Sequence, residues 1–134
     1  MKKAMGWPKR QRKKRLLHHR KSILQEKDGR CYLCMLLHDD ERIHLTTEEH
    51  HIFFGTGQRW KSEEDGLKVH LCLPHHRTGP EAVHMNARIC RKLQRIAQRE
   101  YEKTHTREQF RQRYGKSYII ADEKEVFRHE DSPG

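Results

Sequence analysis

The chain has few of the residues that build a large hydrophobic core. Only 33% of its 134 residues are hydrophobic and 7% are aromatic, whereas globular chains contain about 45–50% apolar residues on a count that includes glycine. A chain of this length and composition folds as one small domain with tails. Such a domain commonly needs a disulfide or a metal ion to supplement its core.

Long hydrophobic runs are also absent. No run approaches the ~18 apolar residues that a membrane-spanning helix needs, and the basic N-terminal residues lack the apolar segment of a secretory signal. The sequence therefore predicts no membrane partner and a cytoplasmic protein, in which cysteines stay reduced. Reduced cysteines in a short chain indicate metal binding rather than disulfides.

Four residues have the spacing of a structural zinc site. Cys31 and Cys34 form one pair, and Cys72 and His75 form a second pair, with 37 residues between the two pairs. Structural Zn²⁺ takes four thiolate or imidazole ligands, typically from two tight turns. We expect these four residues to hold one Zn²⁺ ion, although the spacing also occurs in zinc modules that only bind nucleic acid. The remaining cysteine, Cys90, falls in a helical pattern and is expected in the core.

Three histidines close to these pairs are left over. His50 and His51 lie between the pairs and His76 directly follows the second. Spare imidazoles on a zinc-bound scaffold suggest an open, catalytic metal site. Adjacent strand residues point to opposite faces, so His50 and His51 share a site only if the strand ends or distorts there; a pair of surface histidines is the alternative. The other histidines are expected on the surface: His18, His19, His38, His44, His70, His105 and His129.

The net charge of +10 is confined to the N-terminal residues. Residues 1–30 hold 12 lysines and arginines against two acidic residues, while the two charges balance in the rest of the chain. Such a segment normally binds a polyanion, because counterion release favours binding to DNA without sequence preference. We predict DNA as a partner, and a solvated tail is the alternative. The predicted contacts are Lys9, Arg10, Arg12, Lys13, Lys14 and Arg15, with Arg59 and Lys61 in a later loop.

The first half of the chain predicts short elements. A basic helix is expected over Leu16–Glu26, ending near Gly29, and a turn over Cys31–Cys34. Ile43–Ile52 and Gly66–Leu71 contain β-formers in partial alternation and are expected as strands. The glycines and charged residues between them predict a loop over Phe53–Asp65.

The second half predicts helices. Cys72–His76 is expected to lead into helix, and Pro80 suits the first turn of a longer one. Thr106 and Gln109 predict a capping box for a further helix that ends at Gly115. A short strand is expected near Ser117–Ala121, followed by a frayed end. The apolar stripe of the long helix is Ala82, Met85, Ile89, Leu93 and Ile96.

Glu48–Ile52 followed by Leu71–His76 resembles the HNH, or His-Me finger, family of endonucleases. The stretches His50–Arg59 and Gly66–Asn86 are similar to small phage and prophage proteins of that type. The resemblance covers about Cys31–Asn86, under half of the chain. It implies an α+β fold: a small zinc-stabilised ββα-metal domain, with a helical C-terminal extension and a basic N-terminal arm.

The resemblance also implies roles for residues. His50 and His76 would bind a catalytic divalent ion such as Mg²⁺, and His51 would be the general base that activates water. Structural Zn²⁺ would be held by Cys31, Cys34, Cys72 and His75, with His75 standing where the family more often has cysteine.

Two positions depart from the family pattern. Gly66 and Leu67 occupy the region where the family has an asparagine, about five residues before Leu71 and Cys72. Pro80 stands where the family often has a further histidine, one turn after His76. His84, or less favourably Asn86, would then complete the divalent-metal site.

The expected organisation is a basic arm over 1–30, a zinc-bound nuclease core over 31–86, a helical extension over 80–114 and a tail over 115–134. The expected function is a metal-dependent DNA endonuclease of phage or prophage origin, acting in a bacterial host cell. The alternative is a non-catalytic zinc protein on the same scaffold that binds nucleic acid or acts as an inhibitor. The missing asparagine favours this alternative slightly.

Overall fold

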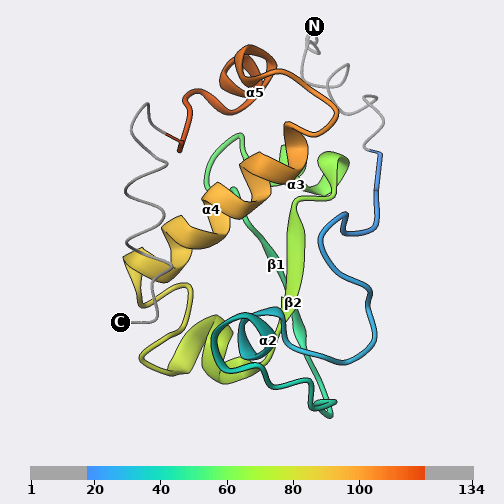
Figure 1. The fold of residues 1–134 in the computed structure, drawn as a ribbon, viewed down its shortest axis with the longest axis vertical. Helices are drawn as coiled ribbons and strands as arrows, with labels where there is room; N and C mark the ends of the chain where they lie inside the picture. The colour runs from blue at the N-terminus through green and yellow to red at the C-terminus, as the bar shows by residue number, and fades with distance from the viewer. Residues whose placement is uncertain (1–17, 120–134) are drawn as a thin grey trace, which may run out of the picture.

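Two short antiparallel strands form the only sheet in residues 18–119, the part of the chain that the computed structural model describes (Figure 1). β1 (Glu48–His51) pairs with β2 (Lys68–Leu71), so that His50 lies opposite Val69. This mixture of helices with a small sheet is α+β, as predicted. The helices are α2 (Tyr32–His38), α3 (Arg59–Asp65), the π-helical turn η2 (Pro74–Thr78), α4 (Ala87–Tyr101) and α5 (Arg107–Tyr114).

Both strands are shorter than predicted, and the connection between them contains a helix. Of the strand expected over Ile43–Ile52, only Glu48–His51 forms, and Ile43 makes an isolated bridge with Arg30. The loop expected over Phe53–Asp65 is wrong in its second half, because α3 begins at Arg59. Gly66 takes a left-handed conformation with φ of 74° and ends this helix, a conformation that glycine adopts at little cost. β2 therefore begins only at Lys68.

The helix expected over Leu16–Glu26 is absent from its described part. Residues 18–25 run in an irregular path beside the outer edge of β2 instead. The Ser22 hydroxyl donates to the Lys68 carbonyl over 2.5 Å, and the His70 amide donates to the Gln25 side chain over 2.7 Å. These contacts satisfy backbone groups that an uncovered edge strand would expose. Covering the edge outweighed the local helical preference of the segment.

The zinc-spaced segments adopt helical structure. The turn expected over Cys31–Cys34 is the start of α2, in which the Cys31 side chain caps the helix by accepting from the Cys34 amide. The second pair leads into η2, with the amides of His75 and His76 both donating to the Cys72 carbonyl.

The long helix starts later than predicted. It begins at Ala87 rather than near Pro80, because the Asn86 side chain accepts from the first free amides and caps it. Leu93 and Ala97 are buried, but Ala82 and Met85 precede the helix, and Met85 is 69% exposed. The predicted stripe was therefore right only in its later half. Cys90 packs partly buried against the core, as expected.

The end of the described chain confirms one prediction and corrects another. Thr106 and Gln109 form the predicted capping box of α5, and Gly115 ends that helix. Residues 117–119 have an irregular path with bends at 118 and 119 instead of the start of a strand. Residues 120–134 and the arm residues 1–17 lie outside the described residues. None of the helices within 18–119 is long and apolar enough to cross a membrane.

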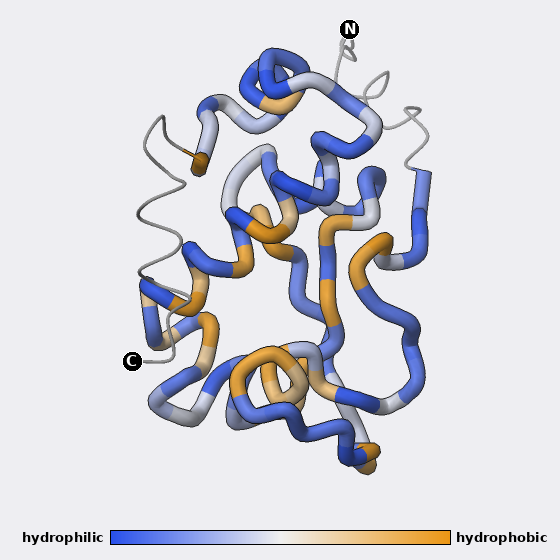
Figure 2. The backbone as a smooth tube through the Cα atoms, viewed as in Figure 1, coloured by the Kyte–Doolittle hydropathy of each residue, from blue (hydrophilic) through white to orange (hydrophobic). Residues whose placement is uncertain are grey.

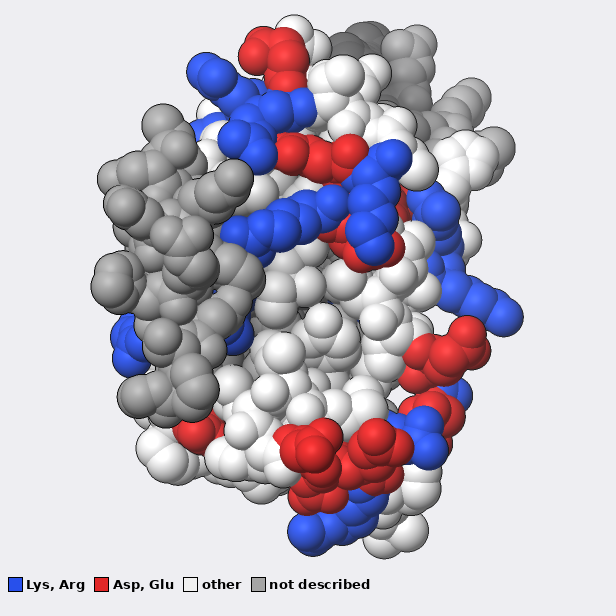
Figure 3. All heavy atoms as spheres, in the orientation of Figure 1, with Lys and Arg blue, Asp and Glu red and all other residues white. Residues whose placement is uncertain are grey.

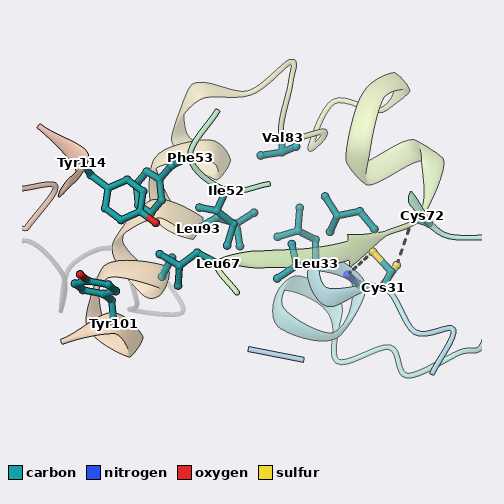
Figure 4. Packing of buried hydrophobic residues seen from close by; sticks show 14 of the residues in the cluster. Cys31, Leu33, Ile52, Phe53, Leu67, Cys72, Val83, Leu93, Tyr101 and Tyr114 are labelled. Carbon is teal, nitrogen blue, oxygen red and sulfur yellow. Dashed lines mark hydrogen bonds between the residues drawn. The ribbon is translucent and has the colours of Figure 1, made fainter. Parts of the chain in front are cut away.

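The core runs from a thiol-rich end to an aromatic end. Figure 4 shows Cys31 and Cys72 at one end, and Phe53, Tyr101 and Tyr114 at the other. The Phe53 ring packs against Tyr114 and Phe110, with ring centroids 4.7 Å and 5.4 Å away respectively. Figure 2 shows hydrophobic residues concentrated in α2 and alternating along β2, whereas residues 18–22 and most of α5 are hydrophilic. The core is small, in keeping with the composition.

Ser62 fixes the chain directly after β1. Its fully buried hydroxyl donates to the Phe53 carbonyl over 2.9 Å and accepts from the Phe53 amide over 3.0 Å. Replacing Ser62 with alanine would leave both backbone groups unpaired, which costs about 1–3 kcal/mol. We predict a loss of that size in the free energy of unfolding of Ser62→Ala, measured by urea denaturation with zinc present. The exposed Thr104→Ala serves as a control, within about 0.5 kcal/mol of wild type; equal stability of the two variants would contradict this role.

Candidate metal centres

Three thiols and one imidazole converge at the end of the core where α2 meets η2. Cys31, Cys34, Cys72 and His75 are all buried, and their Sγ and ring nitrogen atoms lie within 4.8 Å of one another. The Cys34 and Cys72 sulfurs are 3.8 Å apart, and His75 Nδ1 lies 3.4 Å from each of them. Cys31 Sγ is 3.6 Å from the same nitrogen.

These distances match the edges of a zinc tetrahedron. With Zn–S of about 2.3 Å and Zn–N of about 2.0–2.1 Å, the edges are about 3.8 Å between sulfurs and about 3.6 Å between sulfur and nitrogen. A disulfide would require about 2.05 Å between sulfurs, and all the cysteines are free. The cluster could therefore hold a metal ion such as zinc. The predicted ligand set is the set that the structure brings together.

Without a metal ion, burial favours the protonated form of the thiols in this cluster. Burial, together with the neighbouring Cys31 thiol, raises the pKa of Cys34 above its usual range, and burial likewise raises the pKa of Cys72. Without a cation these thiols stay protonated, whereas a bound ion draws out their protons.

A carboxylate orients the imidazole of this cluster. Glu81 receives a hydrogen bond from His38 Nε2 over 2.7 Å and lies 3.3 Å from His75 Nε2. Because an ionised carboxylate only accepts, His75 donates from Nε2 and keeps the lone pair on Nδ1, which faces the sulfurs.

A second group of imidazoles lies on the other side of η2. His50 from β1, His76 from η2 and His84 have ring nitrogens within 4.8 Å of one another. The Nε2 atoms of His76 and His84 are 3.2 Å apart, close to the ~3.3 Å edge of a tetrahedral site with three nitrogen ligands. They line a pocket of about 260 Å³, together with His51, Glu49, Phe54, Arg59 and Arg77.

His50 is the least satisfied polar side chain in this group. The residue is 3% exposed, and its Nε2 atom is buried with no hydrogen-bond partner. Burial, with the nearby His76 and His84, lowers the pKa of His50 to about 3, so the ring is neutral at pH 7. A buried, neutral and unpartnered imidazole nitrogen costs free energy unless it binds a donor or a cation. The residues present therefore fit a metal ion.

Glu48 orients the His76 ring of the imidazole group. His76 Nδ1 donates to Glu48 Oε1 over 2.5 Å, and Arg77 Nε donates to that oxygen over 3.2 Å. The hydrogen bond from His76 lowers the pKa of Glu48, so the carboxylate accepts and His76 keeps its lone pair on Nε2. Consecutive residues of a helical turn point in different directions. His75 and His76 consequently face two different centres.

His51 belongs to a separate, charged group. It is the last residue of β1 and its Nε2 atom lies 2.7 Å from Glu63 Oε1. The buried Lys68 amine lies 3.1 Å from Glu63 and 3.2 Å from Glu49. Burial opposes ionisation of Glu63, but hydrogen bonds from His51, His19 and Lys68 outweigh it and lower the pKa of Glu63 to about 2. Lys68 already supplies a cation here, so this group does not require a metal ion.

Only some of the other predicted site residues lie at the imidazole group. His84 joins the imidazole group, whereas Asn86 caps α4. Arg59 lines the same pocket, but Lys61 turns away and donates to the Arg113 carbonyl. The arm contacts Lys9–Arg15 lie outside the described residues. Two histidines expected on the surface are not fully exposed: His70 is buried, and His44 is half-buried with Nε2 3.7 Å from Cys34 Sγ.

The carboxylates that hold these histidines were not predicted from the sequence. Glu48, Glu63 and Glu81 lie 28, 12 and 6 residues from the histidines they contact. Glu48 precedes the histidine doublet closely enough to be suspected, but Glu63 sits in a run with Glu64 and Asp65. Nothing in that run distinguishes one acid from its neighbours before the fold is known.

Comparisons of the chain with protein-family models, with curated proteins and with solved structures return no match. The function proposed below therefore rests on the geometry of these residues and on the resemblance of short sequence motifs described above.

Removing one thiol tests the cluster of Cys31, Cys34, Cys72 and His75. Binding free energy at a structural zinc site is folding free energy, so Cys34→Ser or Cys72→Ser should lose about one zinc ion per chain and should unfold or aggregate. Elemental analysis and thermal melting measure both effects. Cys90→Ser makes the same chemical change outside the cluster and should retain zinc. Wild-type melting of the Cys34 and Cys72 variants would exclude a structural metal here.

Proposed function

We propose that this chain is a metal-dependent DNA endonuclease of the HNH type, which hydrolyses phosphodiester bonds. The observation that carries the proposal is the buried His50, whose Nε2 atom has no hydrogen-bond partner and whose ring lies beside His76 and His84. These three histidines line a pocket that also contains His51 and Arg59. A metal-binding group and a candidate base thus share one pocket with an arginine. The resemblance of Glu48–Ile52 and Leu71–His76 to the HNH family supports the same interpretation.

His50, His76 and His84 would hold the catalytic ion. A divalent ion bound there would stabilise charge on the scissile phosphate and on the departing oxygen. Three imidazoles suit Zn²⁺, Ni²⁺ or Fe²⁺ better than Mg²⁺, which prefers oxygen ligands. A transition metal is therefore favoured over the Mg²⁺ ion that the sequence suggested.

His51 would act as the general base. The ionised Glu63 carboxylate accepts a hydrogen bond from His51 Nε2–H over 2.7 Å. The Nδ1 atom of His51 therefore carries the lone pair. That nitrogen would take a proton from the attacking water. Glu63 would fix the ring orientation and stabilise the protonated imidazole, as a carboxylate does behind the histidine of other hydrolases.

Two arginines would bind the substrate phosphate. Arg59 and Arg77 line the pocket from α3 and η2. The Arg77 guanidinium already donates from Nε to Glu48, which holds the side chain next to His76. Guanidinium groups bind phosphate oxygens through two parallel hydrogen bonds.

Plasmid nicking with added Mg²⁺, Mn²⁺, Zn²⁺ or Ni²⁺ tests the activity and separates the two histidine roles. His51→Ala should lower the cleavage rate by ~10²–10⁴-fold, the usual contribution of a general base, yet keep the affinity for the divalent ion. His76→Ala should weaken ion binding as well as cleavage, as measured by isothermal titration calorimetry. Both variants should retain the Cys-bound zinc.

His105→Ala is the control, because His105 stacks on Tyr101 near α5 and lines no part of this pocket. Full cleavage by His51→Ala would exclude the proposed mechanism. A wild-type chain that binds DNA but cleaves with none of these ions would favour the non-catalytic zinc protein.

Glu63→Gln tests the orientation of His51. The amide keeps the shape of the side chain but can donate to Nε2, which selects the wrong tautomer. We expect kcat to fall at least tenfold, up to the ~10⁴-fold loss that the equivalent change causes in a serine-protease triad, with KM little changed. Glu64→Gln is the matched control, because its carboxylate pairs with Arg113 instead. In ¹⁵N NMR spectra, the His51 ring should lose its Nε2-protonated signature only in Glu63→Gln; an unchanged signature would refute the positioning role.

A further inference from the structure

A second polar pocket lies beside the proposed active site. It has a volume of about 440 Å³ and is formed between residues 19–27 and the sheet. Glu49 lines both this pocket and the one that contains His50 and His51. The two pockets therefore share a wall. A ligand longer than one phosphate group could occupy both.

The segment that forms this pocket is held firmly in place. The Arg20 amide donates to the Glu63 carbonyl over 3.3 Å, and the Ile23 amide donates to the Gly66 carbonyl over 3.0 Å. Ser22 and Gln25 bind the edge of β2, as described above. His19 Nδ1 lies 2.7 Å from the second oxygen of Glu63, whose first oxygen binds His51. The pocket is thus built on the group that orients the proposed base.

Basic side chains surround the pocket without acidic partners. Arg20, Lys21 and Lys27 line it and are exposed, and within residues 18–119 their side chains form no hydrogen bond or ion pair. Elsewhere in the described chain, Arg30, Arg42 and Arg113 each pair with an aspartate. Glu49 shares the Lys68 amine with Glu63, and Glu26 is the other acid of the lining. Figure 3 shows basic side chains projecting from the edge where this segment runs in Figure 1.

We propose that this pocket binds backbone phosphates of DNA next to the scissile phosphate, with Arg20, Lys21 and Lys27 as the contacts. The proposal rests on the proposed nuclease function and locates its substrate path. An extended polyanion fits better than a small anion, because the chain that enters this pocket at His19 is preceded by further basic residues in positions 1–17. Clustered lysines and arginines provide affinity for a phosphate backbone without reading sequence.

The test is a triple substitution, Arg20→Gln, Lys21→Gln and Lys27→Gln, in the full chain. Binding to a duplex DNA is measured by fluorescence anisotropy at several salt concentrations, without added divalent ion. The slope of log affinity against log salt should become shallower by about 0.9 for each phosphate that is no longer neutralised, and so by as much as ~2.7. Cleavage at subsaturating DNA should slow together with the lost affinity, because these side chains would hold the substrate.

The matched control is Lys103→Gln, Arg111→Gln and Lys116→Gln, which removes the same charge from exposed residues that line neither pocket. Its slope should stay close to that of wild type. An unaltered slope in the first triple variant, or an equal change in the control, would overturn this inference while leaving the proposed function standing. A chain that shows the expected slopes but never cleaves DNA would instead overturn the proposed function alone.

Discussion

The rest of this structure depends on the convergence of three buried thiols and one imidazole between α2 and η2. The chain has too few apolar residues for a large core, so a cluster that ties Cys31 and Cys34 to Cys72 and His75 joins segments that packing alone would hold weakly. Its effect extends beyond stability. His75 and His76 are adjacent in one π-helical turn, so the contacts that fix His75 also set the direction of His76.

Carboxylates fix the tautomers of three of the histidines. His75, His76 and His51 are held by Glu81, Glu48 and Glu63 respectively. In each pair the ionised carboxylate accepts a hydrogen bond from one ring N–H, which leaves the lone pair on the other ring nitrogen. His50 has no such partner and is the most deeply buried of the imidazole group. His50 Nε2 is therefore a buried ring nitrogen without a hydrogen-bond partner, whereas carboxylates orient the other three rings.

The basic residues near the N-terminus contact the group that contains His51. The sequence suggested one basic arm over residues 1–30, yet residues 18–25 are part of the fold and cover the edge of β2. Through His19 they also share Glu63 with His51. Residues 18–25 thus carry positive charge and also contact the carboxylate that orients His51, the proposed base. This segment would therefore couple substrate binding to the proposed reaction.

The sequence by itself determined the four residues of the thiol-rich cluster, two of the three histidines of the imidazole group, His50 and His76, and the capping box of α5, and the family resemblance indicated the α+β class. These features depend on ligand chemistry, charge and local backbone preference, all of which are visible in short windows of sequence. Only the tertiary structure decided that residues 18–26 are not helical, that α3 lies within the expected loop and that His84 rather than Asn86 joins His50 and His76. It also selected Glu63 from three consecutive acids. Those outcomes depend on which backbone groups the sheet edge exposes and on which side chains meet across long separations, and local preferences do not encode either.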